Sequence, residues 1–358
     1  MTVYPGIDFA YGHDDNLFLQ QTAPRSSNFT VISPYIRAEA KPGPHKFDVA
    51  LRIADGRYHS SAADSYTDYS LLGNGDMVFS GRSGLKLRAE FRHGHDPRGS
   101  NDRAFSATPD EYDNLGIDGV FRYGAPGAQG RVEIDGGVFS RNYTNNRATT
   151  AASDRDTSQL GGTFFWRVMP RTELLAQYGY RNIDYQLSTS TLSSNEERFF
   201  VGVKWEATAA TTGTVRFGRI SKDFKSSTRQ DYSSTGWDVG LRWSPLTYSV
   251  FDFVTSKQPG ESTGLGDTIV GTNYGVTWSH AWSSRLNTQV LGSFRNDAYK
   301  GAGTTRNDDT TSFGLRAAYD FRRWLRFGAE YTYWNRDSNT TGFDYKRNLF
   351  MFTVGATL

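Results

Sequence analysis

Apolar and charged residues alternate along this chain in many separate runs. Residues 85–92 read LKLRAEFR and residues 325–331 read LRFGAEY, with an apolar side chain at nearly every second position. A period of two predicts β-strands with one apolar and one charged face. Enclosing so many ionised groups in a dry core would cost several kcal/mol for each group. The charged face must therefore be wet, and the apolar face must meet lipid.

Composition agrees with strands rather than helices as the membrane-crossing elements. The 358 residues contain no run of 18 apolar residues, which excludes a transmembrane helix. A transmembrane barrel keeps a low mean hydropathy, here −0.59, because only alternate residues face lipid. The absence of cysteine fits an envelope compartment. Met1 is followed directly by a strand pattern, so we interpret it as a start codon added to a mature sequence. A net charge of +2 gives no reason to expect nucleic acid as a partner.

An aromatic residue followed by turn residues recurs about every 40 positions. A soluble propeller has a similar period but needs four short strands per repeat, whereas two strands of about 12 to 14 residues fit here. We expect a single domain over residues 1–358, all-β, forming a transmembrane antiparallel up-and-down barrel of about 18 strands in the bacterial outer membrane. Short turns and both termini would be periplasmic, and long polar loops extracellular. The recurring aromatics would form a periplasmic girdle: Phe79, Tyr123, Trp166, Trp205, Trp243, Trp282 and Phe321.

The last stretch, 348–358, predicts the strand that closes the barrel. Counting back in twos from Leu358 to Phe350 gives only apolar residues, and such a strand must be paired to avoid aggregation. Two other stretches fit the pattern badly. In Leu246 to Thr255 the apolar parity changes, which predicts a bulge. Ser65 to Phe79 is interrupted by glycine and asparagine and is a weak strand.

A barrel of this width is too wide for side chains to fill, so we expect an aqueous lumen. Basic residues outnumber acidic ones on its predicted wall, and rings of arginine and lysine favour anions. The alternative is that these charges pair across strands and only stiffen the wall. The predicted lumen-lining charged residues are Arg88, Arg92, Arg122, Arg131, Arg181, Arg198, Lys204, Arg216, Arg316, Arg326, Glu90, Asp118, Glu133 and Glu330.

Six aromatic residues share the charged face and are candidate stacking platforms for sugar rings, although each can also simply fill lumen space. They are Tyr35, Phe139, Phe165, Phe200, Trp324 and Trp334. Evidence for other chemistry is weak. His93 and His95 share a strand face but lack a convincing third metal ligand, and no serine–histidine pair has a nucleophile context. We expect no metal, no cofactor and no enzymatic activity.

Near its start the chain contains Asp14-Asp15-Asn16 followed by Leu17, and Ser33-Pro34 lies in the second predicted strand. These residues resemble a family of outer-membrane β-barrels whose genes often lie beside those for exopolysaccharide synthesis and export, with His13 standing where an aromatic is common in that family. It implies passage of a secreted polysaccharide across the outer membrane. It also implies periplasmic or inner-membrane export proteins as partners, with outer-membrane lipid and lipopolysaccharide around the barrel.

Three functions remain open from the sequence. The first is a passive, charged conduit for polysaccharide export. The second is a general or sugar-selective diffusion porin, in which a long loop should fold inward as a constriction, with Arg92 to Tyr112 as the candidate. The third is a structural or docking barrel with a blocked lumen.

Overall fold

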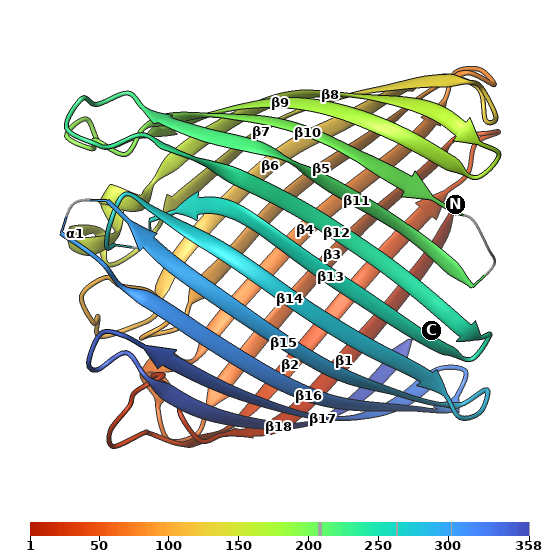
Figure 1. Ribbon diagram of the computed structural model, residues 1–358. Helices are drawn as coiled ribbons and strands as arrows, with labels where there is room; N and C mark the ends of the chain where they lie inside the picture. The colour runs from red at the N-terminus through yellow and green to blue at the C-terminus, as the bar shows by residue number, and fades with distance from the viewer. Residues whose placement is uncertain (207–209, 263, 302, 358) are drawn as a thin grey trace.

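The computed structural model describes residues 1–206, 210–262, 264–301 and 303–357, and it forms one closed antiparallel β-barrel (Figure 1). Among these residues, no helix is long and apolar enough to span a membrane. The barrel has 18 strands: β1 Thr2–Asp14, β2 Ser27–Ala40, β3 Lys46–Tyr58, β4 Tyr66–Val78, β5 Ser83–Asp96, β6 Asp110–Tyr123, β7 Gly130–Tyr143, β8 Arg155–Met169, β9 Thr172–Tyr185, β10 Ser194–Trp205, β11 Thr211–Phe224, β12 Tyr232–Leu246, β13 Ser249–Glu261, β14 Thr268–Ala281, β15 Leu286–Lys300, β16 Asn307–Arg322, β17 Leu325–Ser338 and β18 Tyr345–Thr357.

Each strand pairs with its neighbours in the sequence, and β18 closes the ring on β1. The closing pairing runs from Gly6 opposite Thr357 to Asp14 opposite Leu349. Closure removes the free edge that an apolar terminal strand would otherwise expose. The prediction of an up-and-down barrel is confirmed, and the last strand closes it as expected. Leu358 itself lies outside the described residues.

The outer face of the barrel is apolar and exposed. On β18, for example, Phe350 and Phe352 alternate with the inward Met351, and Phe352 is 66% exposed. In a water-soluble protein such a band would be covered, whereas in a membrane barrel it meets lipid. The hydrophobic effect therefore holds the barrel in the bilayer, and the backbone hydrogen bonds of the closed ring satisfy the peptide groups there.

The two ends of the barrel differ in their connections. At one end, called here the turn end, Pro170 and Arg171 suffice to join β8 to β9, and Thr247 and Tyr248 join β12 to β13. Both termini lie at this end (Figure 1). The opposite end, called here the loop end, carries the longer connections, a 3-10 helix η1 (Ala62–Asp64), the short helix α1 (Arg147–Thr150) and η2 (Ala151–Ser153).

Three details of the sequence prediction need correction. Some connections at the loop end are shorter than the long polar loops that were expected, since β13 continues as strand to Glu261 and β14 begins at Thr268. The register shift lies between Trp243 and Leu246 at the end of β12, whereas the bulge was expected within 246–255. The weak stretch 65–79 forms the regular strand β4, because cross-strand hydrogen bonds on both sides outweigh low intrinsic propensity.

Candidate solute passage

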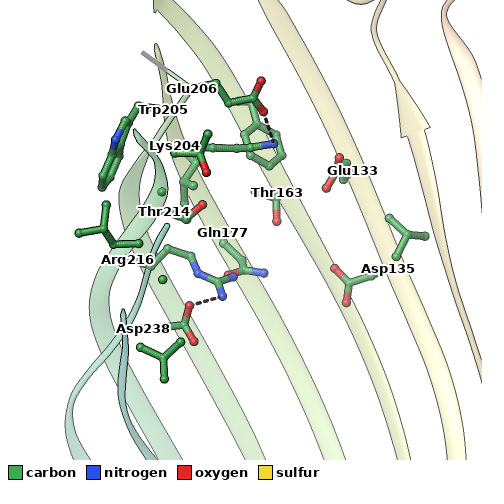
Figure 2. Close-up of a pocket in the computed structure, with 18 of the residues that line it drawn as sticks. Glu133, Asp135, Thr163, Gln177, Lys204, Trp205, Glu206, Thr214, Arg216 and Asp238 are labelled. Carbon is green, nitrogen blue, oxygen red and sulfur yellow. Dashed lines mark hydrogen bonds and ion pairs between the residues drawn. The ribbon is translucent and has the colours of Figure 1, made fainter. Parts of the chain in front are cut away.

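The pairing register places the fourteen predicted charged residues on the inner face of the barrel. Arg88 lies opposite Asp118, and Arg122 lies opposite Glu133. On the far side of the ring, Arg316 lies opposite Glu330. A cavity of about 790 Å³ occupies the lumen beside β6–β13. Figure 2 shows several of its lining residues projecting from the wall. Their part in solute passage remains a prediction.

Most of these inner charges are paired. Arg216 donates to Asp238 at 2.7 Å, Arg198 to Glu196 at 3.0 Å and Arg316 to Glu330 at 3.0 Å. Further pairs join Arg88 to Glu90, Arg131 to Glu133 and Glu173, Arg181 to Glu196, Lys204 to Glu206, and Arg326 to Asp320. Arg88–Glu90, Arg131–Glu133 and Arg198–Glu196 join residues two apart on one strand. Pairs such as Arg216–Asp238 and Arg316–Glu330 join different strands and can stiffen the sheet, so pairing across strands accounts for part of the wall.

A smaller set of inner cations has no carboxylate within 4.0 Å among the described residues. Five of them lie on neighbouring strands, β5 to β8, and are Lys86, Arg92, Arg122, Arg155 and Arg167. Arg336, on β17, lies apart from these five and donates to the Phe343 carbonyl oxygen at 2.6 Å. Lys86, Arg122 and Arg167 lie near the turn end, Arg92 and Arg155 lie nearer the loop end, and carboxylates such as Asp118 lie between the two groups. Because the charge of these five cations is not cancelled locally, they form an interrupted positive stripe on this part of the wall.

We expect the channel to prefer anions mildly and to lose that preference when the stripe is reversed. The double variant Arg122→Glu and Arg167→Glu removes two unpaired cations and adds two anions near the turn end. The reversal potential in a KCl gradient should shift toward cation preference by a clear margin. Arg57→Glu is the control, because Arg57 lies on the outer face and pairs with Asp55. A shift of equal size in both variants would show that the stripe does not set selectivity.

The six candidate stacking aromatics divide into three groups. Tyr35, Phe139 and Trp334 share the inner face, and arginines lie near two of the rings. Phe165 and Phe200 are only 7% and 8% exposed, and the Arg131 guanidinium covers the Phe165 ring at 3.7 Å. The stacking prediction is therefore wrong for these two, because their faces are already in contact with protein.

Trp324 was also placed wrongly. It lies with Arg323 in the connection between β16 and β17, not on the wall, because β17 begins only at Leu325. Alternation cannot be extended past the end of a strand. The seven aromatics of the predicted girdle do gather at the turn end, in or next to the ends of the even-numbered strands. All but Trp205 are exposed on the protein surface. Exposed rings at this height can lie beside the lipid headgroups.

The candidate metal residues do not share one site. His93 Nδ1 lies 2.7 Å from Asp113, and His95 Nδ1 lies 2.8 Å from Asp68. Within the described part of the chain, no group of three or more histidine or acidic residues is arranged to hold a metal ion.

The connection 97–109 between β5 and β6 folds across the loop end of the lumen. Its Asp102 accepts a hydrogen bond from Arg306 at 2.6 Å. Arg306 lies in the connection between β15 and β16, nine strands away from β6 in the ring of 18, which is the opposite side of the barrel. A contact between these two residues therefore requires the loop to span the lumen.

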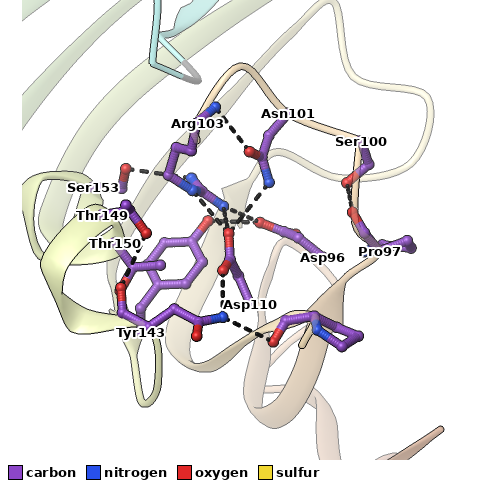
Figure 3. A network of polar contacts seen from close by, with 12 residues as sticks. Asp96, Pro97, Ser100, Asn101, Arg103, Asp110, Tyr143, Thr149, Thr150 and Ser153 are labelled. Carbon is purple, nitrogen blue, oxygen red and sulfur yellow. Dashed lines mark hydrogen bonds and ion pairs between the residues drawn. The ribbon is translucent and has the colours of Figure 1, made fainter. Parts of the chain in front are cut away.

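Several anchors hold this crossing loop at its base. Arg98 donates to Asp64 at 2.7 Å, and this hydrogen bond raises the pKa of Arg98 above its usual range. Arg103 lies between Asp96 and Asp110, 2.9 Å from each, and its guanidinium lies 4.6 Å from the centre of the Tyr143 ring (Figure 3). The loop is thus fixed to β3–β4, to its own strands and to β7.

Close backbone contact fixes the loop further along. Gly99 has a φ of +81°, and a Cβ added there would lie 2.1 Å from the Phe18 carbonyl oxygen, so only glycine fits. The Phe18 ring packs edge-on against Phe105, with the Arg98 guanidinium 4.5 Å from its centre. The loop between β1 and β2 therefore supports the crossing loop from one side.

The far anchor is a buried ion-pair group. The Arg306 side chain is 2% exposed and also binds Asp308, while the Phe343 ring lies 3.6 Å from its guanidinium carbon. Burial acts to lower the pKa of Arg306, but the hydrogen bonds to Asp308 and Asp102 outweigh burial and raise it above its usual range. Arg306 therefore stays charged, and the crossing loop is held by a charge-assisted bond in a dry setting.

Sequence reasoning missed a second group of buried charges near the loop end. Lys222 Nζ and Glu196 are fully buried and lie 3.5 Å apart, and Lys222 also bonds Glu261 at 2.5 Å. Glu261 lies on β13, whereas Lys222 lies on β11, so the end of β13 leaves β12 and reaches past it. No pattern in the sequence indicates this contact.

Comparison with known proteins gives a consistent picture of the fold. The chain can be superposed on OccK1 (OpdK) of Pseudomonas aeruginosa with a TM-score of 0.57 at 12% identity, covering 99% of each chain. OccK3 (OpdO) of the same organism gives 0.56 at 12% identity, covering 99% of this chain and 96% of that one. OccAB4 of Acinetobacter baumannii gives 0.52 at 11% identity, covering 100% of both. At such identities the likeness concerns the fold.

No curated protein matches the sequence. A family model, in contrast, matches the whole chain, residues 1–358, and carries the description "Putative beta-barrel porin 2". Association with exopolysaccharide gene clusters, which the resemblance implied, finds no support in these matches. The closed 18-stranded barrel, with its apolar outer face and charged inner face, agrees with that description. The chain therefore belongs to the family described as Putative beta-barrel porin 2, and it is an outer-membrane channel of the porin type.

Proposed function

We propose that the chain is a diffusion porin that passes small hydrophilic solutes, with both termini and the turn end in the periplasm. The observation that carries this proposal is the crossing loop, anchored on the far side by Asp102 and Arg306. A loop folded into the lumen narrows the passage, which suits a channel that selects small solutes by size and charge. The loop was expected within Arg92 to Tyr112, where it lies.

Export of a polysaccharide is the weaker reading. A polymer leaving the cell would have to displace the crossing loop. The Asp102–Arg306 bond would then have to stay broken for as long as the polymer occupies the lumen. The chain belongs to a family described as porins, which favours diffusion over export. The expected polysaccharide substrate, the periplasmic or inner-membrane export partners, and contacts with lipopolysaccharide all stay predictions, as does the absence of enzymatic activity.

Proteoliposome swelling tests the proposal directly. Liposomes containing the purified barrel should swell quickly in arabinose or galactose and slowly in the tetrasaccharide stachyose, because the loop restricts the cross-section. Empty liposomes and liposomes containing heat-denatured protein are the controls. Absence of swelling with every sugar would contradict a diffusion porin and favour the blocked, structural barrel. Equal rates for galactose and stachyose would contradict a constriction and favour a wide conduit.

A further inference from the structure

The Phe139 ring lies flat against the inner wall because two glycines make room for it. A Cβ added to Gly116, opposite Phe139 on β6, would lie 2.8 Å from the ring. A Cβ added to Gly137, two residues earlier on β7, would lie 3.0 Å from the ring. Any other residue at these positions would push the ring away from the wall. The half-buried ring therefore forms a platform beside the lumen, unlike the covered rings of Phe165 and Phe200.

A row of residues that contains three arginines crosses the wall at the level of Arg141, which lies two residues from Phe139 toward the loop end. The register aligns Arg92, Asn114, Arg141 and Arg155 across four neighbouring strands. Arg141 is already engaged, since it bonds Asp96 at 2.9 Å. Arg92 and Arg155 have no carboxylate within 4.0 Å in the described part of the chain. Arg155 Nη1 does donate to the Ser153 carbonyl oxygen at 3.1 Å. Both guanidinium groups nevertheless keep donors that no carboxylate occupies and that can bind an anion just above the ring.

Carboxylates lie on the other side of the platform. Asp118 is aligned with Gly137, one step toward the turn end, and Glu90 is aligned with Gly116. Glu90 pairs with Arg88, whereas Asp118 has no cation within 4.0 Å among the described residues. An ionised carboxylate only accepts hydrogen bonds, so Asp118 suits a ligand with hydroxyl donors.

These groups line one cavity of about 430 Å³. Its volume falls in the range of roughly 300–1,000 Å³ that holds small ligands in proteins. It contains a ring platform, two unpaired cations on one side and a hydrogen-bond acceptor on the other. Because the cations and the acceptor lie on opposite sides of the ring, the cavity can orient a ligand. A wall that only repels cations cannot do this.

We propose that this cavity is a binding site for a cyclic sugar acid, a six-membered ring with one carboxylate and several hydroxyl groups. The sugar ring stacks its C–H face on Phe139, the carboxylate binds Arg92 and Arg155, and a hydroxyl donates to Asp118. This inference rests on the proposed function, because the site lies along the passage and deepens its specificity. An aromatic acid shares the ring and the carboxylate but lacks several hydroxyls to donate.

Current blockade in planar bilayers tests the site. Galacturonate should interrupt the single-channel current of the wild-type barrel at concentrations where galactose does not, and benzoate should act more weakly than galacturonate. Phe139→Leu should raise the concentration for half-blockade about tenfold, the loss expected when a ring contact of this kind is removed. The double variant Arg92→Gln and Arg155→Gln should abolish the difference between galacturonate and galactose.

Two matched controls separate binding from general effects on the lumen. Arg122→Gln removes an unpaired cation of the same wall outside the cavity, and Tyr35→Leu removes an inner ring on another part of the barrel. Both should leave half-blockade by galacturonate within twofold of wild type. Equal weakening by Arg122→Gln, or no weakening by Phe139→Leu, overturns the proposal, as does blockade by benzoate at lower concentration than galacturonate.

Calorimetric titration of galacturonate into the detergent-solubilised barrel gives a readout that does not depend on conduction. The site is supported if the wild type and Tyr35→Leu give a heat of binding and Phe139→Leu does not. This result would hold even if the channel proved to be closed. Absence of binding heat in a barrel that conducts galactose overturns the site and leaves the porin function standing. Failure of sugar diffusion with binding intact would contradict the porin function alone.

Discussion

Arg306→Ala is expected to open the loop end of the barrel and raise its single-channel conductance severalfold. The Arg306 side chain is buried with Asp102 and Asp308, so its removal leaves two carboxylates without their shared cation. Breaking a buried pair by removing one partner costs about 3–5 kcal/mol. A cost of that size at the far anchor favours release of the crossing loop over the closed arrangement.

Planar bilayer recordings of the wild type and the variant measure this effect, and limited proteolysis of residues 97–109 reports release of the loop. Arg147→Ala is the matched control, because Arg147 also pairs with an aspartate at the loop end but does not bridge the lumen. Unchanged conductance in Arg306→Ala, with the loop still protected from protease, would show that the contact between Arg306 and the crossing loop does not restrict the passage.

Phe352→Arg is expected to impair assembly of the barrel in lipid. Phe352 lies in the middle of the closing strand, on the outer face and 66% exposed. An arginine facing lipid near the bilayer midplane costs about 2–4 kcal/mol. The closing pair β1–β18 joins the two ends of the chain, so we expect the loss to appear as slower insertion and lower folding free energy.

Urea-dependent folding into phospholipid vesicles, followed by heat-modifiable gel mobility, gives both quantities. Met351→Arg is the control, because Met351 faces the lumen next to Glu330, where an arginine can stay hydrated and pair. A loss in Met351→Arg as large as that in Phe352→Arg would mean that the outer face of β18 does not meet the membrane interior.

Alternation in the sequence predicted the barrel, its strand number and the two-faced wall correctly. This success has a local cause. Within a single strand, such as 85–92, the alternation of side chains already shows which residues face lipid and which face the lumen. Strand limits were less well predicted. β13 continues to Glu261 because β14 pairs with its backbone there, although these residues resemble a loop.

The candidate site was predicted only in part. Parity placed Phe139 and Phe165 equally on the inner face, yet Arg131 covers Phe165 while glycines leave Phe139 against the wall. Parity also could not show which arginines pair. Arg88 and Arg92 are alike in sequence, but only Arg88 has an acidic partner within reach.

The sequence by itself determined that the chain crosses a membrane as strands, because a lipid face and a wet face follow from side-chain order along each strand. The tertiary structure alone decided what the lumen does with its charges. Asp102 and Arg306 are 204 residues apart, and no local pattern brings them together. Closure of the ring sets which residues face one another across the lumen. Only the folded barrel therefore shows where the crossing loop is anchored and which arginines beside Phe139 have no carboxylate partner among the described residues.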